Sequence, residues 1–303
     1  MDGRRLFSPE YATADQAKER LLECLHQPPE NFQQTGSRWS LATLLKNCEW
    51  LQMHSLCGVC RLLERLGIRY KRARDYLHSP DHDYAAKVAY IQACWQTTRS
   101  APERYVLLYL DEFAFERQPS LDKAYEVQGQ TCPLARLSHR SNTQCRGLGA
   151  LDALTGQVLY CQRTHITTAV LSAFYAQIAL AYPQAETIFV VQDNWPVHIH
   201  PDVLTRLQPQ LSPFWPRVPD NWPSLPSRRA VHDTLPIQLL FLPTYSPWLN
   251  PIEKLWRWVR QQVLHLHRLS DNWELLKQRI LDFIAQFDHG SLALLRYVGL
   301  LPS

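Results

Sequence analysis

Three short uncharged runs constrain the fold of this chain more than any other feature. They cover residues 105–110, 187–192 and 237–242. Each is too short for a typical helix, and an apolar run of this length indicates a strand buried on both faces of a sheet. Helical patterns and one hairpin pattern lie between them. Residues 101–303 are therefore predicted to form an α/β domain with a mixed sheet flanked by helices.

Acidic residues follow the first two runs, and a third lies early in a later helix. Asp111 and Asp193 are expected where their strands end, and Glu253 lies one turn into a helix that begins near Asn250-Pro251. Carboxylates that converge without Lys or Arg repel one another unless cations intervene. Oxygen ligands select Mg²⁺ or Mn²⁺. Two such ions can stabilise both the attacking and the leaving oxygen in a displacement reaction at phosphorus. For any single Asp, a loop or capping role is the alternative.

A basic helical segment precedes this domain. Short helices are predicted within residues 37–67, and residues 61–74 hold six basic residues and one acidic residue. Helices followed by a basic extended strip are typical of a winged helix-turn-helix. A solvated helix face with an edge strand is the alternative. The candidate DNA-binding residues are Arg61, Arg65, Arg69, Lys71, Arg72 and Arg74.

Sequence character divides the chain into four parts. They are an N-terminal helical extension (1–35), the winged helix-turn-helix (36–78), a linker helix (79–100) and the catalytic α/β domain (101–303). A proline-rich insertion at about 208–235 contains six prolines, which excludes a central strand or a long helix there. Two interpretations stay open: a loop that stacks on DNA or contacts a partner, and a passive surface insertion.

Composition excludes several classes of protein. A hydrophobic content of 46% and a charged content of 20% are those of a globular chain. No run approaches 18 apolar residues, so no membrane span is expected. The eight cysteines are scattered, and Cys57-Gly58-Val59-Cys60 lacks a second ligand pair. Reduced thiols in the cytoplasm are expected rather than a disulfide framework or a zinc site.

Three sequence blocks are distinctive. The most specific is the run Tyr-Ser-Pro-x-Leu-Asn-Pro-Ile-Glu within Leu242–Trp256. The others are Tyr109-Leu110-Asp111-Glu112 and the block Gln192–His198. Together they resemble the IS630 / Tc1–mariner family of DDE transposases. The resemblance covers nearly the whole chain from Gly36 onward.

The resemblance implies an RNase H-like catalytic domain after a small winged helix-turn-helix domain. It identifies Asp111, Asp193 and Glu253 as the catalytic triad that binds two Mg²⁺ ions, with Mn²⁺ as a substitute. The implied enzyme cleaves transposon ends and transfers the freed 3′-hydroxyl into target DNA. The implied partners are double-stranded DNA, with TA as target, and a second copy in a homodimer that forms before or on DNA. The implied location is the bacterial cytoplasm, in association with the nucleoid.

Four further residues match the family blocks. Asn194 and His198 are candidates for positioning a phosphate or a metal-bound water, and a helix cap is equally open for Asn194. Tyr245 and Ser246 are expected to shape the active-site loop. Glu112 is expected to face the other side of its strand in a structural role, because neighbouring strand residues alternate between faces.

Two departures from the family keep alternative functions open. The stretch from Asp193 to Glu253 is longer than the family's usual spacing, and too few residues precede Arg38 for the additional helix-turn-helix that relatives usually carry. The first alternative is a truncated or domesticated DNA-binding protein of the same fold without transposition activity. The second is an RNase H-like nuclease that acts on hybrids, which the winged module disfavours.

Overall fold

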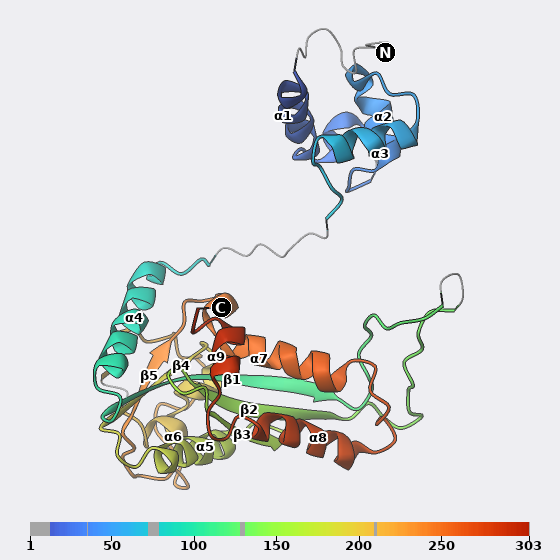
Figure 1. Ribbon diagram of the computed structural model, residues 1–303. Helices are drawn as coiled ribbons and strands as arrows, with labels where there is room; N and C mark the ends of the chain where they lie inside the picture. The colour runs from blue at the N-terminus through green and yellow to red at the C-terminus, as the bar shows by residue number, and fades with distance from the viewer. Residues whose placement is uncertain (1–12, 35, 72–78, 128–130, 209–210, 303) are drawn as a thin grey trace. The chain divides into compact units, whose positions relative to one another are not determined.

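The chain divides into two compact units, residues Met1–Tyr76 and Leu77–Ser303 (Figure 1). The computed structural model describes residues 13–34, 36–71, 79–127, 131–208 and 211–302. Within those ranges, none of the helices combines the length and the apolar character that a membrane crossing requires.

The first unit is a small helical bundle. Its helices are α1 (Ala14–Leu25), α2 (Leu41–Asn47) and α3 (Leu56–Arg65), each with a hydroxyl side chain as N-cap. One apolar cluster joins all three: Leu21 of α1 packs with Leu44 of α2 and with Val59 and Leu62 of α3. Helix α1 therefore shares a core with the two helices that follow, although the sequence analysis assigned it to a separate extension.

The basic surface of this unit lies on and after α3. Arg61 and Arg65 are exposed one helical turn apart, and Arg69 and Lys71 are exposed just beyond the helix. The candidates Arg72 and Arg74 lie outside the described residues. The described segment after α3 forms no strand, so the wing stays a prediction.

The second unit is built on a five-stranded mixed sheet with the strand order β3-β2-β1-β4-β5. Strands β1, β4 and β5 are parallel, whereas β2 is antiparallel to both of its neighbours. The strand bounds are β1 Tyr105–Glu116, β2 Gln144–Asp152, β3 Val158–Arg163, β4 Thr187–Gln192 and β5 Ile237–Phe241. The predicted hairpin and the three predicted buried strands are thus present.

Strand β1 is longer than the sequence predicts. We expected it to end at Asp111, but it continues to Glu116 because β2 pairs with it along its whole second half, from Leu108↔Asp152 to Glu116↔Gln144. Its parallel pairing with β4 ends earlier, at Tyr109↔Val191. Asp111 therefore lies within a strand, at the point where the neighbouring strand has stopped.

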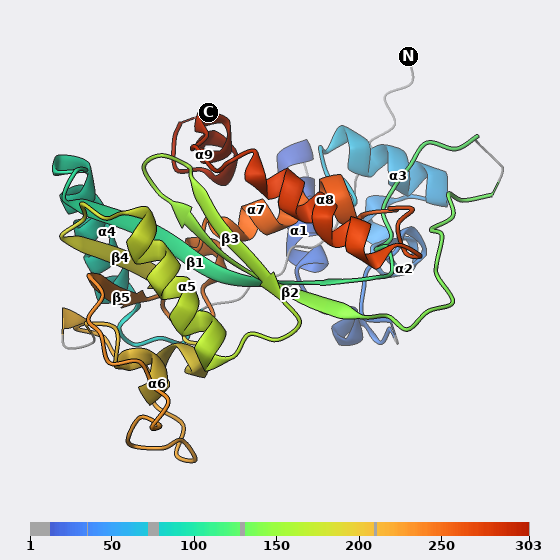
Figure 2. The same ribbon diagram turned by 90° about the horizontal axis from the view of Figure 1, so that it is seen from below.

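Helices cover both faces of the sheet (Figures 1 and 2). Even-numbered β1 residues such as Leu108 and Leu110 pack with α5 and α6 on one face. Odd-numbered residues such as Leu107 and Phe113 face the other side, which α4, α7, α8 and α9 cover. The bounds are α4 Tyr84–Ser100, α5 Thr168–Ala181, α6 Pro201–Leu204, α7 Ile252–Val259, α8 Trp273–Ala285 and α9 Leu292–Val298.

A buried polar contact ties the segment before α4 to the loop after β5. Asp81 Oδ2 accepts hydrogen bonds from Lys87 Nζ and from the Thr244 amide, both at 2.8 Å. Ser79 Oγ donates to the Thr244 carbonyl at 2.6 Å. The Asp81 and Lys87 side chains are only 7% and 10% exposed. Burial alone would raise the pKa of Asp81, but these donors and the Asp83 amide hold it at about 2.

We predict that Asp81→Asn lowers the free energy of unfolding at pH 7 by about 3 kcal/mol, because Lys87 would keep a buried charge without its partner. Since the folded pKa is lowered, the stabilisation is present above about pH 4 and is lost as the pH falls towards 2. The wild type and Asp81→Asn should therefore have nearly equal free energies of unfolding at pH 2, as measured by urea unfolding.

The matched control is Asp220→Asn, which breaks an ion pair with Arg217 whose side chains are 86% and 84% exposed. It should change the unfolding free energy by less than about 1 kcal/mol. Equal effects of the two substitutions would show that the buried contact does not anchor the segment.

Candidate active site

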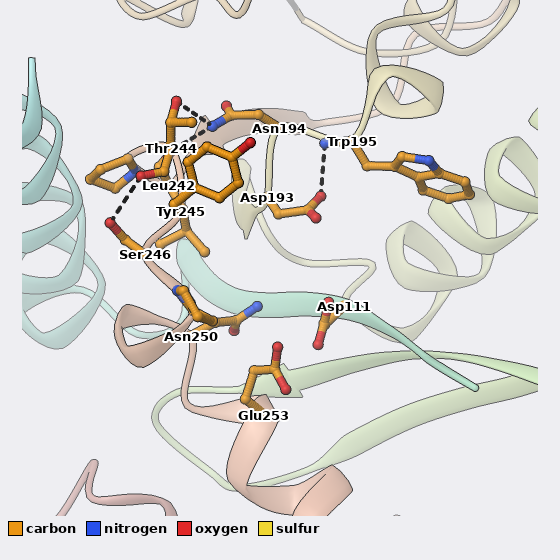
Figure 3. A pocket seen from close by; sticks show the side chains of 12 residues that line it. Asp111, Asp193, Asn194, Trp195, Leu242, Thr244, Tyr245, Ser246, Asn250 and Glu253 are labelled. Carbon is orange, nitrogen blue, oxygen red and sulfur yellow. Dashed lines mark hydrogen bonds between the residues drawn. The ribbon is translucent and has the colours of Figure 1, made fainter. Parts of the chain in front are cut away.

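A cavity of about 360 Å³ opens where β4 and β5 end and β1 continues. Its walls come from β1, from the loops after β4 and β5, and from the start of α7 (Figure 3). All three predicted acids lie in it. The lining residues are Asp111, Asp193, Asn194, Trp195, Leu242, Pro243, Thr244, Tyr245, Ser246, Pro247, Asn250 and Glu253.

Asp111 is held by an indole on the α7 side of the sheet. Trp256 Nε1 donates to its Oδ2 at 2.9 Å, and the Trp256 ring is fully buried. Gly149, directly opposite Asp111 on β2, leaves room for this ring, since a Cβ there would collide with it. This contact was not predicted from the sequence; the pattern Glu-x-x-Trp, which puts both residues on one helix face, is the available signal.

Glu253 enters the cavity from the first turn of α7. Asn250, just before that helix, donates from Nδ2 to the Leu110 carbonyl at 3.2 Å, and so fixes the start of α7 beside Asp111. Figure 3 shows the carboxylates of Asp111 and Glu253 turned towards each other. The Asn-Pro pair therefore places the glutamate.

Asp193 reaches the cavity from the loop that follows β4. Its Oδ1 accepts a hydrogen bond from the Trp195 amide at 2.9 Å. Asn194 next to it does not cap the following turn. Instead its Nδ2 donates to the Leu242 carbonyl at 2.9 Å, which joins the loops after β4 and β5.

The loop after β5 carries the two other predicted residues. Tyr245 has a positive φ of 55° and an exposed ring, an uncommon conformation for a bulky residue. Ser246 is buried and donates back to the Thr244 carbonyl at 3.4 Å. Both line the cavity, so the structure places them in the loop they were expected to shape.

Burial and mutual repulsion shift the pKa values of these acids. Burial, followed by the charges of Glu253, Glu112 and Asp193, raises the pKa of Asp111 to about 8. Burial also raises the pKa of Glu253. Burial alone would likewise raise the pKa of Asp193, but its contact with His198 leaves it lowered.

The oxygen atoms that line the cavity suit hard divalent cations as ligands. Among the described residues, neither Asp111 nor Glu253 forms an ion pair with Lys or Arg. The side-chain oxygens of Asn194 and Asn250 are buried and lack a hydrogen-bond donor. Carboxylate and amide oxygens without donors are the ligands that Mg²⁺ and Mn²⁺ prefer.

Glu112 and His198 lie on the opposite face of β1. His198 is fully buried, and its Nε2 lies 3.4 Å from Glu112 Oε1 and 3.4 Å from Asp193 Oδ1. Among the described residues, this is the trio whose candidate ligand atoms all lie within 4.8 Å of one another. Glu112 thus faces away from Asp111 as expected. Its link to Asp193 through His198 was not predicted from the sequence.

Comparison with known proteins identifies the family. The family model "DDE superfamily endonuclease" matches residues 106–277, which is more than half of the chain. The chain therefore belongs to the DDE superfamily of endonucleases. Its resemblance to the IS630 / Tc1–mariner transposases within that superfamily is also confirmed.

One relative and two solved structures illustrate this similarity. The chain is 23% identical over 261 residues to the insertion element IS630 uncharacterized 39 kDa protein of Shigella sonnei, covering 85% of this chain and 67% of that protein. The Mos1 transposase paired-end complex with left transposon end has a TM-score of 0.53 at 16% identity. The Mos1 mariner paired end complex with Mn has a TM-score of 0.54 at 18% identity. Each match covers 96% of this chain and 90% of the Mos1 chain, and confirms the expected RNase H-like fold class.

We predict that Asp111→Asn stabilises the metal-free protein at pH 8. Because the folded pKa of Asp111 is raised to about 8, the wild type loses stability as the pH rises from about 4 to 8. The amide carries no charge and still accepts from Trp256, so urea unfolding in EDTA should show a gain of about 5 kcal/mol at pH 8. At pH 4 the difference should vanish.

Asp193→Asn is the matched control, because the pKa of Asp193 is lowered rather than raised. This variant should gain no stability at pH 8. If Asp111→Asn destabilised the metal-free protein at pH 8, the account of repelling carboxylates would be wrong.

Proposed function

We propose that this DDE transposase cleaves transposon ends and transfers the freed 3′-hydroxyl into target DNA, using divalent metal ions held by Asp111, Asp193 and Glu253. The observation that carries the proposal is the convergence of these three carboxylates in one cavity, where none of them forms an ion pair with a Lys or Arg among the described residues. A site that serves successive in-line displacements needs no covalent protein–DNA intermediate. Retention of all three acids favours activity over the alternative of a domesticated DNA-binding protein.

In this proposal, Asp111, Asp193 and Glu253 would hold two Mg²⁺ ions, with Mn²⁺ as a substitute. Bound ions of this kind activate the attacking hydroxyl and stabilise the leaving oxygen. The chain's own residues fix the geometry: Trp256 orients Asp111, and Asn250 places Glu253 through the Leu110 carbonyl. The Mos1 paired end complex with Mn supports the use of a divalent metal.

The partner in this proposal is double-stranded DNA, at the transposon ends and at a TA target. The exposed side chains of Arg61, Arg65, Arg69 and Lys71 suit sequence-independent phosphate contacts. Arg72 and Arg74 extend the same basic run in the sequence. The exposed ring of Tyr245 at the cavity suits stacking on an unpaired base.

We further infer that the protein acts as a homodimer, formed before or on DNA, because two transposon ends must be cut and joined together. It works in the bacterial cytoplasm in association with the nucleoid, where its DNA substrate lies. The IS630 relative from Shigella sonnei supports a bacterial setting.

The test is cleavage of a supercoiled plasmid that carries the ends of the element, with Mg²⁺ as the added metal. Asp193→Asn should reduce cleavage below detection without reducing DNA binding in a mobility-shift assay, since Asp193 lies in the cavity and not on the basic surface. Cleavage by the wild type should cease in EDTA and return with Mg²⁺ or Mn²⁺.

The control is Glu274→Gln, which removes an acid of α8 that is 79% exposed and lies outside the cavity. It should cleave like the wild type. Equal DNA binding with no metal-dependent cleavage by the wild type would support the domesticated DNA-binding protein instead.

A further inference from the structure

A second group of potential metal ligands lies behind the cavity, on the α5 side of β1. It consists of Glu112, Asp193 and His198, and it shares only Asp193 with the triad. The side chain of His198 is 0% exposed and that of Glu112 is 16% exposed, whereas that of Asp193 is 53% exposed. The group is therefore closed on the protein side and open to solvent through Asp193.

A chain of hydrogen bonds determines which ring nitrogen of His198 carries the proton. The Tyr175 hydroxyl donates to Gln192 Oε1 at 2.6 Å, so its proton is already used. The Tyr175 oxygen also lies 3.3 Å from His198 Nδ1 and is free to accept a proton from it. With the proton on Nδ1, the lone pair of Nε2 points to Glu112 and Asp193.

With the proton on Nδ1, two buried acceptor atoms of this group, His198 Nε2 and Glu112 Oε1, face each other without a donor between them. Neither His198 Nε2 nor Glu112 Oε1 has a hydrogen-bond partner, although both atoms are buried. Among the described residues, no Lys or Arg forms an ion pair with Glu112 or Asp193. Buried polar atoms rarely remain unpaired, so the group suits a bound cation.

The distances are those of ligands around one small ion. A tetrahedral ion with ligands at about 2.1 Å separates each pair of ligand atoms by about 3.4 Å. The His198 Nε2 to Glu112 Oε1 and His198 Nε2 to Asp193 Oδ1 distances are both 3.4 Å. One nitrogen and two carboxylate oxygens, with an open fourth position, form a ligand set that suits Zn²⁺ and similar transition metals better than Mg²⁺.

We propose that Glu112, Asp193 and His198 form a binding site for a transition-metal cation of the Zn²⁺ class, and that an ion there inhibits cleavage by withdrawing Asp193 from the triad. The inhibitory part rests on the proposed function; the binding part does not. Tyr175 is a positioning residue in this site, because it touches the ion only through His198.

Titration of the purified full-length protein with Co²⁺ tests the binding part without DNA. The wild type should develop the visible absorption of low-coordinate Co²⁺, and an equimolar amount of Zn²⁺ should abolish it. His198→Gln should eliminate the absorption. Tyr175→Phe removes only the hydroxyl that orients His198 and should weaken Co²⁺ binding by about 10- to 100-fold. Circular dichroism of both variants verifies that they are folded.

Glu253→Gln is the matched control, because Glu253 belongs to the triad and not to this group. It should bind Co²⁺ like the wild type. No absorption with the wild type, or unchanged absorption with folded His198→Gln, would overturn the proposal.

Inhibition is measured separately, with Zn²⁺ added to Mg²⁺-dependent plasmid cleavage. Zn²⁺ should inhibit the wild type, and Tyr175→Phe should need about 10- to 100-fold more Zn²⁺ for the same inhibition. Equal sensitivity of the two proteins would overturn the inhibitory role. A wild type that cleaves but binds no Co²⁺ refutes only this site, whereas one that binds Co²⁺ but never cleaves refutes only the proposed function.

Discussion

Repulsion among buried carboxylates is the constraint on which the rest of this structure depends. Burial first, and then the charges of Glu253, Glu112 and Asp193, raise the pKa of Asp111 to about 8. Such a cluster keeps its geometry only if its supports are rigid. Neutral hydrogen bonds supply them: Trp256 holds Asp111, Asn250 holds the start of α7, and Asn194 joins the loops after β4 and β5. None of these supports neutralises the acids, so the charge is left for a cation.

Strand β1 organises this chemistry because its neighbouring residues face opposite sides of the sheet. Asp111 meets Trp256 and Glu253 on the α7 side, and Glu112 meets His198 on the α5 side. Asp193 follows the last residue of β4, so no strand lies between its side chain and either side of the sheet. It therefore lines the cavity and also contacts His198.

Much of the fold and the triad could be predicted from the sequence, because short apolar runs and their flanking acids depend on local pattern. The end of β1 could not, since pairing with β2 extends the strand beyond Asp111 and no local residue signals it. The role of Glu112 could not be predicted either. Residue alternation indicates its face, but only the packing of α5 and the turn at His198 brings an imidazole to it. The packing of α1 against α3 in one core could not be predicted either, because it depends on tertiary contacts.

The most direct measurement of the central claim is anomalous X-ray diffraction at the manganese edge from crystals grown with Mn²⁺. The account predicts an anomalous peak in the cavity, about 2.1 Å from carboxylate oxygens of Asp111 and of Asp193 or Glu253. The peak should be absent from Asp111→Asn crystals grown in the same solution. A peak elsewhere with none among these acids, or an undiminished peak in the variant, would contradict the claim that the carboxylates are arranged to hold a divalent cation.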